Sequence, residues 1–339
     1  MCPVDHTNAT SQPKSMTQQS SSSPSNPLNI LGTWSLTNPR HCLDLRSSED
    51  YATAHLIPST SIPLSTLEQR FSQLPPRTSH TSFLLLTEPN AQFNDIPVSA
   101  LLRSRGWNLT GVIELPVHAD QFWNHARDLN VLGTGSQGAE LLFLPSPIVG
   151  AWSTWIEDSL LRIGRDEARV LDIGCGSGRD LGFLANRQFP WKITGVDNWK
   201  KALERAEVMV TSINSGRLEN LVHAEVNEDS GEIIPCTPDC NRRLPRHIFD
   251  LVIIIRFFPK ELFSSIHRYV REGGYLLFSH FTDPLPGRSY ENPPPNKRVR
   301  PVEVEELLLE SSRDWKILQA EYSECEDGRR LWDVVARYR

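Results

Sequence analysis

Hydrophobic residues are patterned along most of the chain, but not at its beginning. From about residue 29 onward, short apolar runs typical of buried strands alternate with segments whose apolar residues recur every three or four positions, as on one face of a helix. Residues 1–28 are instead rich in Ser, Thr, Gln, Asn and Pro, which predicts a disordered tail. The pattern therefore predicts an α/β protein that begins with a tail.

The first patterned segment, residues 29–125, has the features of a small α/β domain. Its apolar runs predict strands, and the periodic segments between them predict helices. The strands are expected at 41–46, 60–65, 82–87 and 111–116, and the helices at 47–56, 66–74 and 96–105, the last ending before Gly106. Residues 126–145 are mostly polar and contain glycines, which predicts a linker.

Residues 146–339 alternate strands and helices as a doubly wound, Rossmann-like sheet does. Strands are expected at 169–173, 193–196, 221–226, 249–258, 275–281, 315–324 and 331–339, and helices at 145–164, 180–186, 200–214, 260–272 and 301–313. Gly273 and Gly274 predict a turn between a helix and a strand. The predicted fold is thus an α/β protein in which this larger sheet follows a smaller α/β domain.

Composition narrows the class of partner. With 339 residues the chain is longer than one ordinary domain, and its net charge of −6 does not favour nucleic acid as a partner. The strongest apolar run, 251–258, is too short to cross a bilayer and contains Arg256, so we expect no membrane partner. We expect a cytoplasmic location, with the nucleus left open.

The six cysteines are scattered, which indicates a reducing compartment rather than a disulfide framework. Cys236 and Cys240 could form half of a zinc site with His223 or His247. Two cysteines four residues apart are a weak signal, however, and free loop thiols are the commoner case. We therefore expect no metal.

Three glycines follow the strand expected at 169–173, in the stretch VLDIGCGSGRD. Their spacing is not the G-x-G-x-x-G of dinucleotide-binding proteins, and no Gly-Lys-Ser/Thr of a phosphate-binding loop follows. Asp172, directly before the turn, would repel a pyrophosphate but would attract the ammonium and sulfonium of S-adenosylmethionine. Asp197 and Glu225 follow the next two strands, where they could accept hydrogen bonds from the ribose hydroxyls and the adenine amino group.

These residues resemble the class I S-adenosylmethionine-dependent methyltransferases, and the resemblance extends from Ser146 to the C-terminus. LDIGCGSGRD, ITGVD, FDLVIIIRFF and REGGYLLFSHFT are similar to the small-molecule branch that includes the tellurite-resistance (TehB-like) enzymes. The resemblance implies S-adenosylmethionine as the cofactor. It implies cofactor-binding residues at Asp172, Gly174, Cys175, Gly176, Gly178, Asp197, Asn198 and Glu225.

Residues for a methyl acceptor are expected beyond the fourth and fifth strands. Arg256 and Phe257 are the candidates for positioning the substrate, with Phe281 and Thr282 beside them. Arg256 would either bind an anionic substrate or pair with an acidic side chain. Lys297, Arg298 and Arg300 form either a solvated loop or a basic lid over an anionic substrate. A small-molecule substrate is favoured, with a thiol or chalcogen species as the expected nucleophile.

The first domain resembles the rhodanese fold through Asp44, Arg46, Tyr51 and the turn at 55–58. In that family a cysteine after the strand that corresponds to 82–87 carries the chemistry. Here the loop at 87–95 has no cysteine, and Glu88 brings a negative charge, so we expect that sulfur transfer is lost. Asp44 and Arg46 would then be a structural pair, and the domain would dock a protein partner. Three alternatives stay open: methylation of tRNA or protein, a non-catalytic adaptor, and an active sulfurtransferase.

Overall fold

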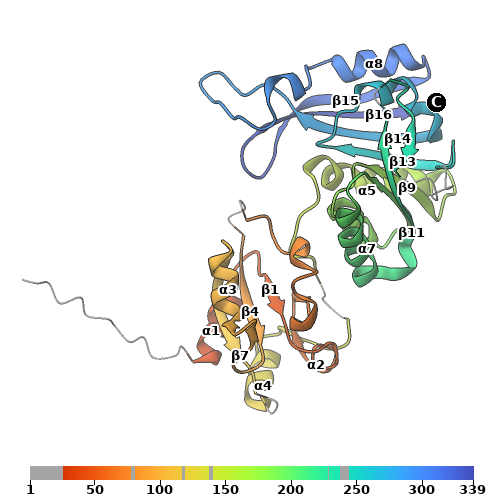
Figure 1. Ribbon diagram of the computed structural model, residues 1–339. Coiled ribbons are helices and arrows are strands. Elements are labelled where there is room, and N and C mark those ends of the chain that lie inside the picture. Colours follow the sequence, from red (N-terminus) through yellow and green to blue (C-terminus); the bar gives the residue numbers. More distant parts are fainter. Residues whose placement is uncertain (1–25, 78–80, 117–118, 137–139, 228, 237–243) are drawn as a thin grey trace, which may run out of the picture.

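The chain forms two regions, each built around its own sheet (Figure 1). The computed structural model describes residues 26–77, 81–116, 119–136, 140–227, 229–236 and 244–339. We call the two parts the four-stranded region, from α1 to β8, and the eight-stranded region, from α5 to β16. The tail predicted for residues 1–28 lies outside the described residues up to position 25, whereas Pro27 and Leu28 begin α1 (Pro27–Ser35).

All four strands of the first sheet run parallel, in the order β3-β1-β4-β7. Two short antiparallel pairs, β2 with β8 and β5 with β6, lie outside this sheet. The strands are β1 (Cys42–Asp44), β2 (His55–Leu56), β3 (Thr60–Ser61), β4 (Ser82–Thr87), β5 (Gln92–Phe93), β6 (Ile96–Pro97), β7 (Asn108–Glu114) and β8 (Leu132–Gly133). The helices are α1, α2 (Ser48–Thr53), α3 (Val98–Ser104) and α4 (Asp120–Asp128). The α/β class predicted for this segment is confirmed in outline.

The helix predicted at 66–74 is wrong. The segment instead contains two 3-10 turns, η1 (Leu64–Thr66) and η2 (Phe71–Gln73). Leu67 and Leu74 are buried, as the apolar spacing predicts, but Leu74 is extended with ψ 160°. Leu74 precedes Pro75, and a residue before proline is disfavoured in the helical conformation. The proline therefore ends the segment before a full helix can form.

The structure also differs from the linker predicted at 126–145. The end of α4 occupies its first residues, Val131 is fully buried in the core of the four-stranded region, and β8 pairs with β2. The backbone of Gly135 donates to the carbonyl of Ala52 at 2.7 Å, and that of Glu140 donates to the carbonyl of Ser59 at 2.9 Å. Polar composition suggested a loop, but tertiary pairing makes much of this stretch part of the four-stranded region.

The second sheet has the strand order β12-β11-β10-β9-β13-β14-β16-β15. Strands β11 to β14 in this order are parallel, while β12 and the β15–β16 pair are antiparallel additions. The strands are β9 (Ala168–Ile173), β10 (Trp191–Asp197), β11 (Leu218–Val226), β12 (Ile233–Pro235), β13 (Phe249–Ile255), β14 (Val270–Phe281), β15 (Trp315–Glu324) and β16 (Arg330–Tyr338). The helices are α5 (Pro147–Arg162), α6 (Arg179–Ala185), α7 (Lys200–Asn214) and α8 (Glu303–Ser311), with 3-10 turns η3 (Ser215–Arg217), η4 (Lys260–Ser264), η5 (Ile266–Arg268) and η6 (Pro295–Lys297). This is the Rossmann-like parallel sheet that the sequence predicted.

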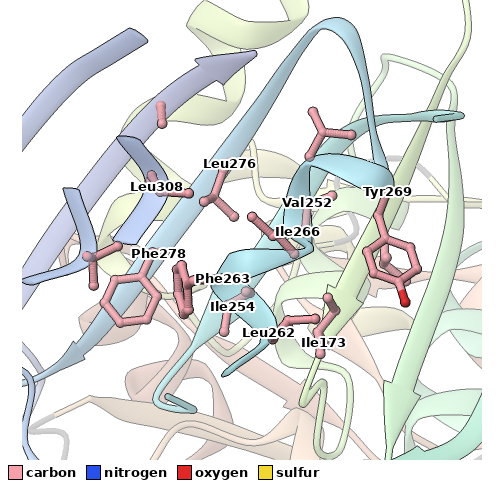
Figure 2. Close-up of a cluster of buried hydrophobic side chains, with 14 of the residues drawn as sticks. Ile173, Val252, Ile254, Leu262, Phe263, Ile266, Tyr269, Leu276, Phe278 and Leu308 are labelled. Atoms are coloured by element: carbon pink, nitrogen blue, oxygen red, sulfur yellow. The ribbon is translucent and has the colours of Figure 1, made fainter. Parts of the chain in front are cut away.

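Helices cover both faces of this sheet, and each face has its own core. On one face α5, α6 and α7 pack against the strands through residues such as Ile156, Leu181 and Leu203. On the other face η4, η5 and α8 pack through Leu262, Phe263, Ile266 and Leu308, as Figure 2 shows. Trp152 and Trp155, on α5, pack edge to face with each other, and Trp155 packs in the same way on Tyr275. Both tryptophans therefore have a packing role.

The helix predicted at 260–272 and two strand boundaries in this region were wrong. Residues 260–268 contain the turns η4 and η5 in place of the helix, and β14 already starts at Val270, so the predicted turn at Gly273 and Gly274 lies within a strand. Between η4 and η5, Ser265 has φ −124°, and its hydroxyl donates to the carbonyls of Gly231 and Leu262. This tertiary contact interrupts the helix that the apolar spacing suggested. The strand predicted at 249–258 ends at Ile255, because Arg256 has a left-handed backbone.

The order of strands fixes where a ligand can bind. β9 is flanked by β10 on one side and β13 on the other, so the chain changes direction across the sheet between β9 and β13. Loops leaving the carboxyl ends of these two strands diverge to opposite faces, which opens a crevice between them. The glycine turn follows β9, and Arg256 follows β13, so both candidate sites lie at this crevice. Within the described residues, no helix combines the length and the apolar character needed to span a bilayer.

Candidate active site

The turn after β9 contains three glycines with a left-handed backbone. φ is +80° at Gly174, +54° at Gly176 and +75° at Gly178, a conformation that costs other residues about 1–2 kcal/mol. A Cβ at Gly178 would lie 2.9 Å from the Cβ of Ala206, and one at Gly174 would lie 3.0 Å from the ring of Phe257. A Cβ at Gly176 would meet no atom within 4 Å. Two of the glycines therefore allow close packing, and open space lies beside the third.

Buried carboxylates lie directly beside this turn. Asp172, in β9, is only 3% exposed and forms no ion pair within the described part of the chain. Burial, together with the negative charges of Asp180 and Asp197, raises the pKa of Asp172 well above its ordinary value. Asp180 accepts hydrogen bonds from the backbone nitrogen and the hydroxyl of Ser146, at 2.7 and 2.6 Å. The turn therefore borders a negative potential that a cationic ligand would neutralise.

Asp197, at the end of β10, is joined to the glycine turn. One carboxylate oxygen accepts from the backbone nitrogen of Gly176 at 2.8 Å, and the other accepts from that of Trp199 at 2.8 Å. Each oxygen keeps capacity for a second donor, such as a hydroxyl group. Asn198 is exposed, and its carbonyl oxygen lies 3.0 Å from Nε2 of His223. The ends of β9 and β10 are thus held together beside the open space at Gly176.

The remaining predicted cofactor residues lie nearby but differ in what they offer. Glu225, on β11, is exposed, and its charge, with that of Asp197, adds to desolvation in raising the pKa of the Cys236 thiol. Cys175 is buried, and its sulfur would lie 2.9 Å from a Cβ placed on Gly195, so its side chain belongs to the core. A contact from Cys175 to a ligand has to come from its backbone.

The zinc hypothesis gains no support from Cys236. That residue is exposed, whereas Cys240 lies outside the described residues. Among the residues that the structure describes, no group of three or more His, Cys, Asp or Glu side chains could hold a metal ion.

Arg256 is held in an unusual conformation at the end of β13. Its φ is +56°, its backbone nitrogen donates to the carbonyl of Ser279 at 2.7 Å, and its guanidinium lies 3.0 Å from the carboxylate of Glu326. Glu326 also lies 3.5 Å from Arg179, the first residue of α6. Arg256 therefore forms an ion pair with an acidic side chain, which was one of the two roles expected for it; the other was binding of an anionic substrate. A left-handed non-glycine residue is uncommon and is often found at functional sites.

A cavity of about 890 Å³ opens beyond the ends of β13 and β14. Phe257 lines it and also contacts Gly174, so this ring lies between the glycine turn and the cavity. Phe281 lines the cavity, whereas Thr282 is buried outside the lining, and its carbonyl accepts from the hydroxyl of Tyr290. The lining residues are Val226, Arg256, Phe257, Phe258, Pro259, Lys260, Glu261, His280, Phe281, Asn292, Pro293, Pro294, Asn296, Lys297, Arg298, Glu303 and Arg329.

His280, on β14, lines this cavity and has one buried ring nitrogen without a partner in the described residues. Its Nε2 lies 2.8 Å from the carbonyl oxygen of Lys297, which requires a proton on Nε2 and leaves Nδ1 as an acceptor. Nδ1 is buried and has no hydrogen-bond partner within the described residues. Burial lowers the pKa of His280, which favours the neutral ring.

Sequence reasoning missed four residues of this site. Ser146 precedes α5 and donates to Asp180. Glu326 and Arg329 come from the loop between β15 and β16, where Glu326 pairs with Arg256 and Arg329 lines the cavity. His280 lies in β14, a strand that its apolar residues predict without indicating a role for the histidine. The serine before Pro147 was a weak helix-start signal, but no local pattern pointed to the other three.

Comparisons with known proteins agree with this geometry. A family model described as a methyltransferase domain matches residues 150–316. The chain carries a methyltransferase domain. It is a class I, S-adenosylmethionine-dependent domain with a Rossmann-like sheet, the protein is an enzyme, and S-adenosylmethionine is its cofactor.

Individual relatives extend beyond this domain or match only part of it. An uncharacterized protein of Schizosaccharomyces pombe, UNK4.09, is 25% identical over 339 residues, covering 89% of this chain and 98% of that protein. The malonyl-[acyl-carrier protein] O-methyltransferase of Paenibacillus is 29% identical over 120 residues, which are 34% of this chain and 39% of that enzyme. A solved SAM-dependent methyltransferase from Aquifex aeolicus is 18% identical, with a TM-score of 0.38, over 54% of this chain and 89% of that one.

The residues at the crevice fit this cofactor. A Cβ at Gly176 would project into the open space there, and the acidic side chains nearby suit a ligand with an ammonium and a sulfonium. When bound, the cofactor supplies an electrophilic methyl group. The protein's part is to hold the acceptor in line with that group and to exclude water.

Proposed function

We propose that the protein methylates a small nucleophile, with a thiol or chalcogen species as the favoured acceptor. The observation that carries this proposal is the position of Phe257, which contacts the glycine turn on one side and lines the cavity of about 890 Å³ on the other. A substrate in that cavity would meet a cofactor at Gly176 across this one side chain. The volume lies within the range of about 300–1,000 Å³ that is usual for small-molecule sites.

We assign the cofactor-binding roles by position. Asp172 would attract the amino-acid end of the cofactor, the backbone of Gly174, Cys175 and Gly176 would face it, and Asp197 would accept from the ribose hydroxyls. Gly178 allows α6 to approach α7, and Asn198 and Glu225 would border the adenine. Arg256 and Phe257 would position the acceptor.

Calorimetric titration with S-adenosylhomocysteine tests this assignment. The wild-type chain should bind, and Asp197→Ala should weaken binding by about tenfold or more, because charged hydrogen bonds to the ribose are lost. Asp166→Ala is the matched control, since Asp166 is exposed in the loop before β9, at the opposite end of that strand. Unchanged affinity in Asp197→Ala would show that the ribose lies elsewhere.

We further propose that the four-stranded region is a rhodanese-like domain that has lost sulfur transfer and docks a protein partner. The four parallel strands and the pairing of Asp44 with Arg46 at 2.6 Å support the first part. The loop after β4 supports the loss of sulfur transfer, because the backbone nitrogen of Asn90 already donates to the carboxylate of Glu114 at 3.3 Å. Transfer of sulfur from thiosulfate to cyanide by a variant with all six cysteines replaced by serine would contradict this proposal.

A further inference from the structure

The cavity beyond β13 and β14 is lined by more cations than carboxylates. Its cationic residues are Arg256, Lys260, Lys297, Arg298 and Arg329, whereas its acidic residues are Glu261 and Glu303. Each of the three arginines pairs with a carboxylate that is not among the lining residues: Arg256 with Glu326, Arg298 with Asp283 and Arg329 with Asp327. Among the described residues, Lys297 is therefore the lining cation that has no ion pair with a carboxylate.

The same wall offers apolar surface directly beside this charge. Phe257, Phe258 and Phe281 line the cavity together with Pro293 and Pro294. The guanidinium carbons of Arg329 and Arg256 lie 4.2 and 5.8 Å from the centroid of the Phe281 ring. An occupant that satisfies both features has an apolar body with a negative group attached to it.

Lys297 is the cation most available to such a group. Its side chain is exposed and pairs with no carboxylate in the described part of the chain, whereas Lys260 lies 2.8 Å from Glu303. The backbone of Lys297 is nevertheless fixed, because its carbonyl accepts from His280. The lysine is thus anchored at the cavity while its ammonium group is left for a ligand.

We propose that the methyl acceptor is an organic anion, with a carboxylate or similar oxyanion on a small apolar body, and that Lys297 and Arg329 bind the anionic group. This rests on the proposed methyl-transfer function and names the substrate class of that site. It also gives the cationic stretch 297–300 a role: part of it lines the substrate cavity.

A pair of synthetic thiols tests the inference. 4-(Mercaptomethyl)benzoate and 4-(mercaptomethyl)benzamide share their nucleophile and nearly their shape but differ in charge. Their binding to the full chain saturated with S-adenosylhomocysteine is measured by calorimetry, and their methylation by mass spectrometry. We expect the carboxylate to bind about tenfold more tightly than the amide, since hydrogen bonds to charged groups are the stronger kind. Added salt should weaken the binding of the carboxylate but not the binding of the amide.

Lys297→Gln should reduce the preference for the carboxylate about threefold or more and leave binding of the amide unchanged. Lys316→Gln is the control: Lys316 is exposed and lies near the start of β15, opposite Arg337 and away from the cavity.

Three results would overturn the inference: equal binding of the two thiols, binding of neither thiol, or a full preference for the carboxylate retained in Lys297→Gln. If both thiols are methylated equally, methyl transfer stands and the charge preference is wrong. If the carboxylate binds preferentially but neither thiol is methylated, the anion site stands and the proposed reaction fails.

Discussion

Each of the two regions buries an aspartate at the end of a parallel strand, and the two aspartates differ in how their charge is satisfied. Asp44, in β1, is fully buried, but both of its oxygens accept from Arg46, whose guanidinium also donates to Ala54 and lies over Trp123. Asp172, in β9, is nearly as buried, has no cationic partner within the described residues, and lies beside the open space at Gly176. A compensated buried charge fixes a structure, whereas an uncompensated one beside open space indicates a ligand.

Removal of Asp44, the partner of the buried Arg46, should have the largest effect on the free energy of unfolding. Asp44→Ala leaves the guanidinium of Arg46 buried and unpaired, and we expect a loss of about 3–5 kcal/mol of unfolding free energy. Denaturant unfolding of the full chain measures this loss. Glu219→Gln is the matched control, because its pair with Arg169 is more than a third exposed on both sides and should contribute less than about 1 kcal/mol. Equal effects of the two changes would contradict the structural role of Asp44.

Two neighbouring glycines separate packing from binding. Gly178→Ala places a Cβ against Ala206 in addition to its left-handed strain, so we expect about 2–5 kcal/mol of destabilisation. Gly176→Ala meets no atom, so only about 1–2 kcal/mol of backbone strain is expected. Its binding of S-adenosylhomocysteine should nevertheless fall by about tenfold or more, because the Cβ occupies the ligand's space. Denaturant unfolding and calorimetry on both variants check the comparison, and stronger binding by Gly176→Ala than by wild type would reverse it.

The protein should be more stable without the buried, unpaired charge of Asp172. Asp172→Asn removes a carboxylate that burial destabilises, so we expect a gain of about 1 kcal/mol or more in unfolding free energy at neutral pH and weaker cofactor binding. The raised pKa means that the folded state keeps a proton that the unfolded state has lost. In wild type this contribution to stability therefore decreases as pH rises from the ordinary aspartate range through the raised pKa, and it is absent in Asp172→Asn. Melting temperatures of both proteins across pH test the sign.

The smallest effect is expected at the pair that joins the two halves of the site. Glu326→Gln weakens contacts to Arg256 and Arg179 that are partly exposed, so the loss of unfolding free energy should stay below about 1 kcal/mol. Because Arg256 is then released beside the cavity, binding of 4-(mercaptomethyl)benzoate should become a few times tighter. Glu324→Gln, which affects an exposed pair with Arg288, should change neither quantity. Weaker binding in Glu326→Gln would contradict the anion site.

Patterns that repeat along the chain allowed most of the fold to be predicted. The alternation of apolar runs and periodic segments predicted the parallel strands, and the glycines and Asp172 indicated the turn proposed to bind the cofactor, because these signals lie within a few residues of one another. The structure brings Asp172, Gly176 and Asp197 together as that reading implies.

What could not be predicted depends on contacts between distant segments. Glu326 meets Arg256 across seventy positions, and His280 acquires its orientation from Lys297. The 3-10 turns η4 and η5 likewise depend on Ser265 bonding to Gly231. Such contacts leave no periodicity in the sequence, since either partner alone is an ordinary residue for its element.

The pairing of β8 with β2 determines where the polypeptide can be divided. A fragment that ends at residue 125 would lack Val131, which is fully buried, and would expose the edge of His55 and Leu56. Its hydrophobic interior would be incomplete, and it should aggregate or melt early. A fragment that continues through Gly135 retains both the valine and the short strand. Proteases acting on the intact protein should accordingly spare the bonds around Leu132, although the local composition looks like an easy target.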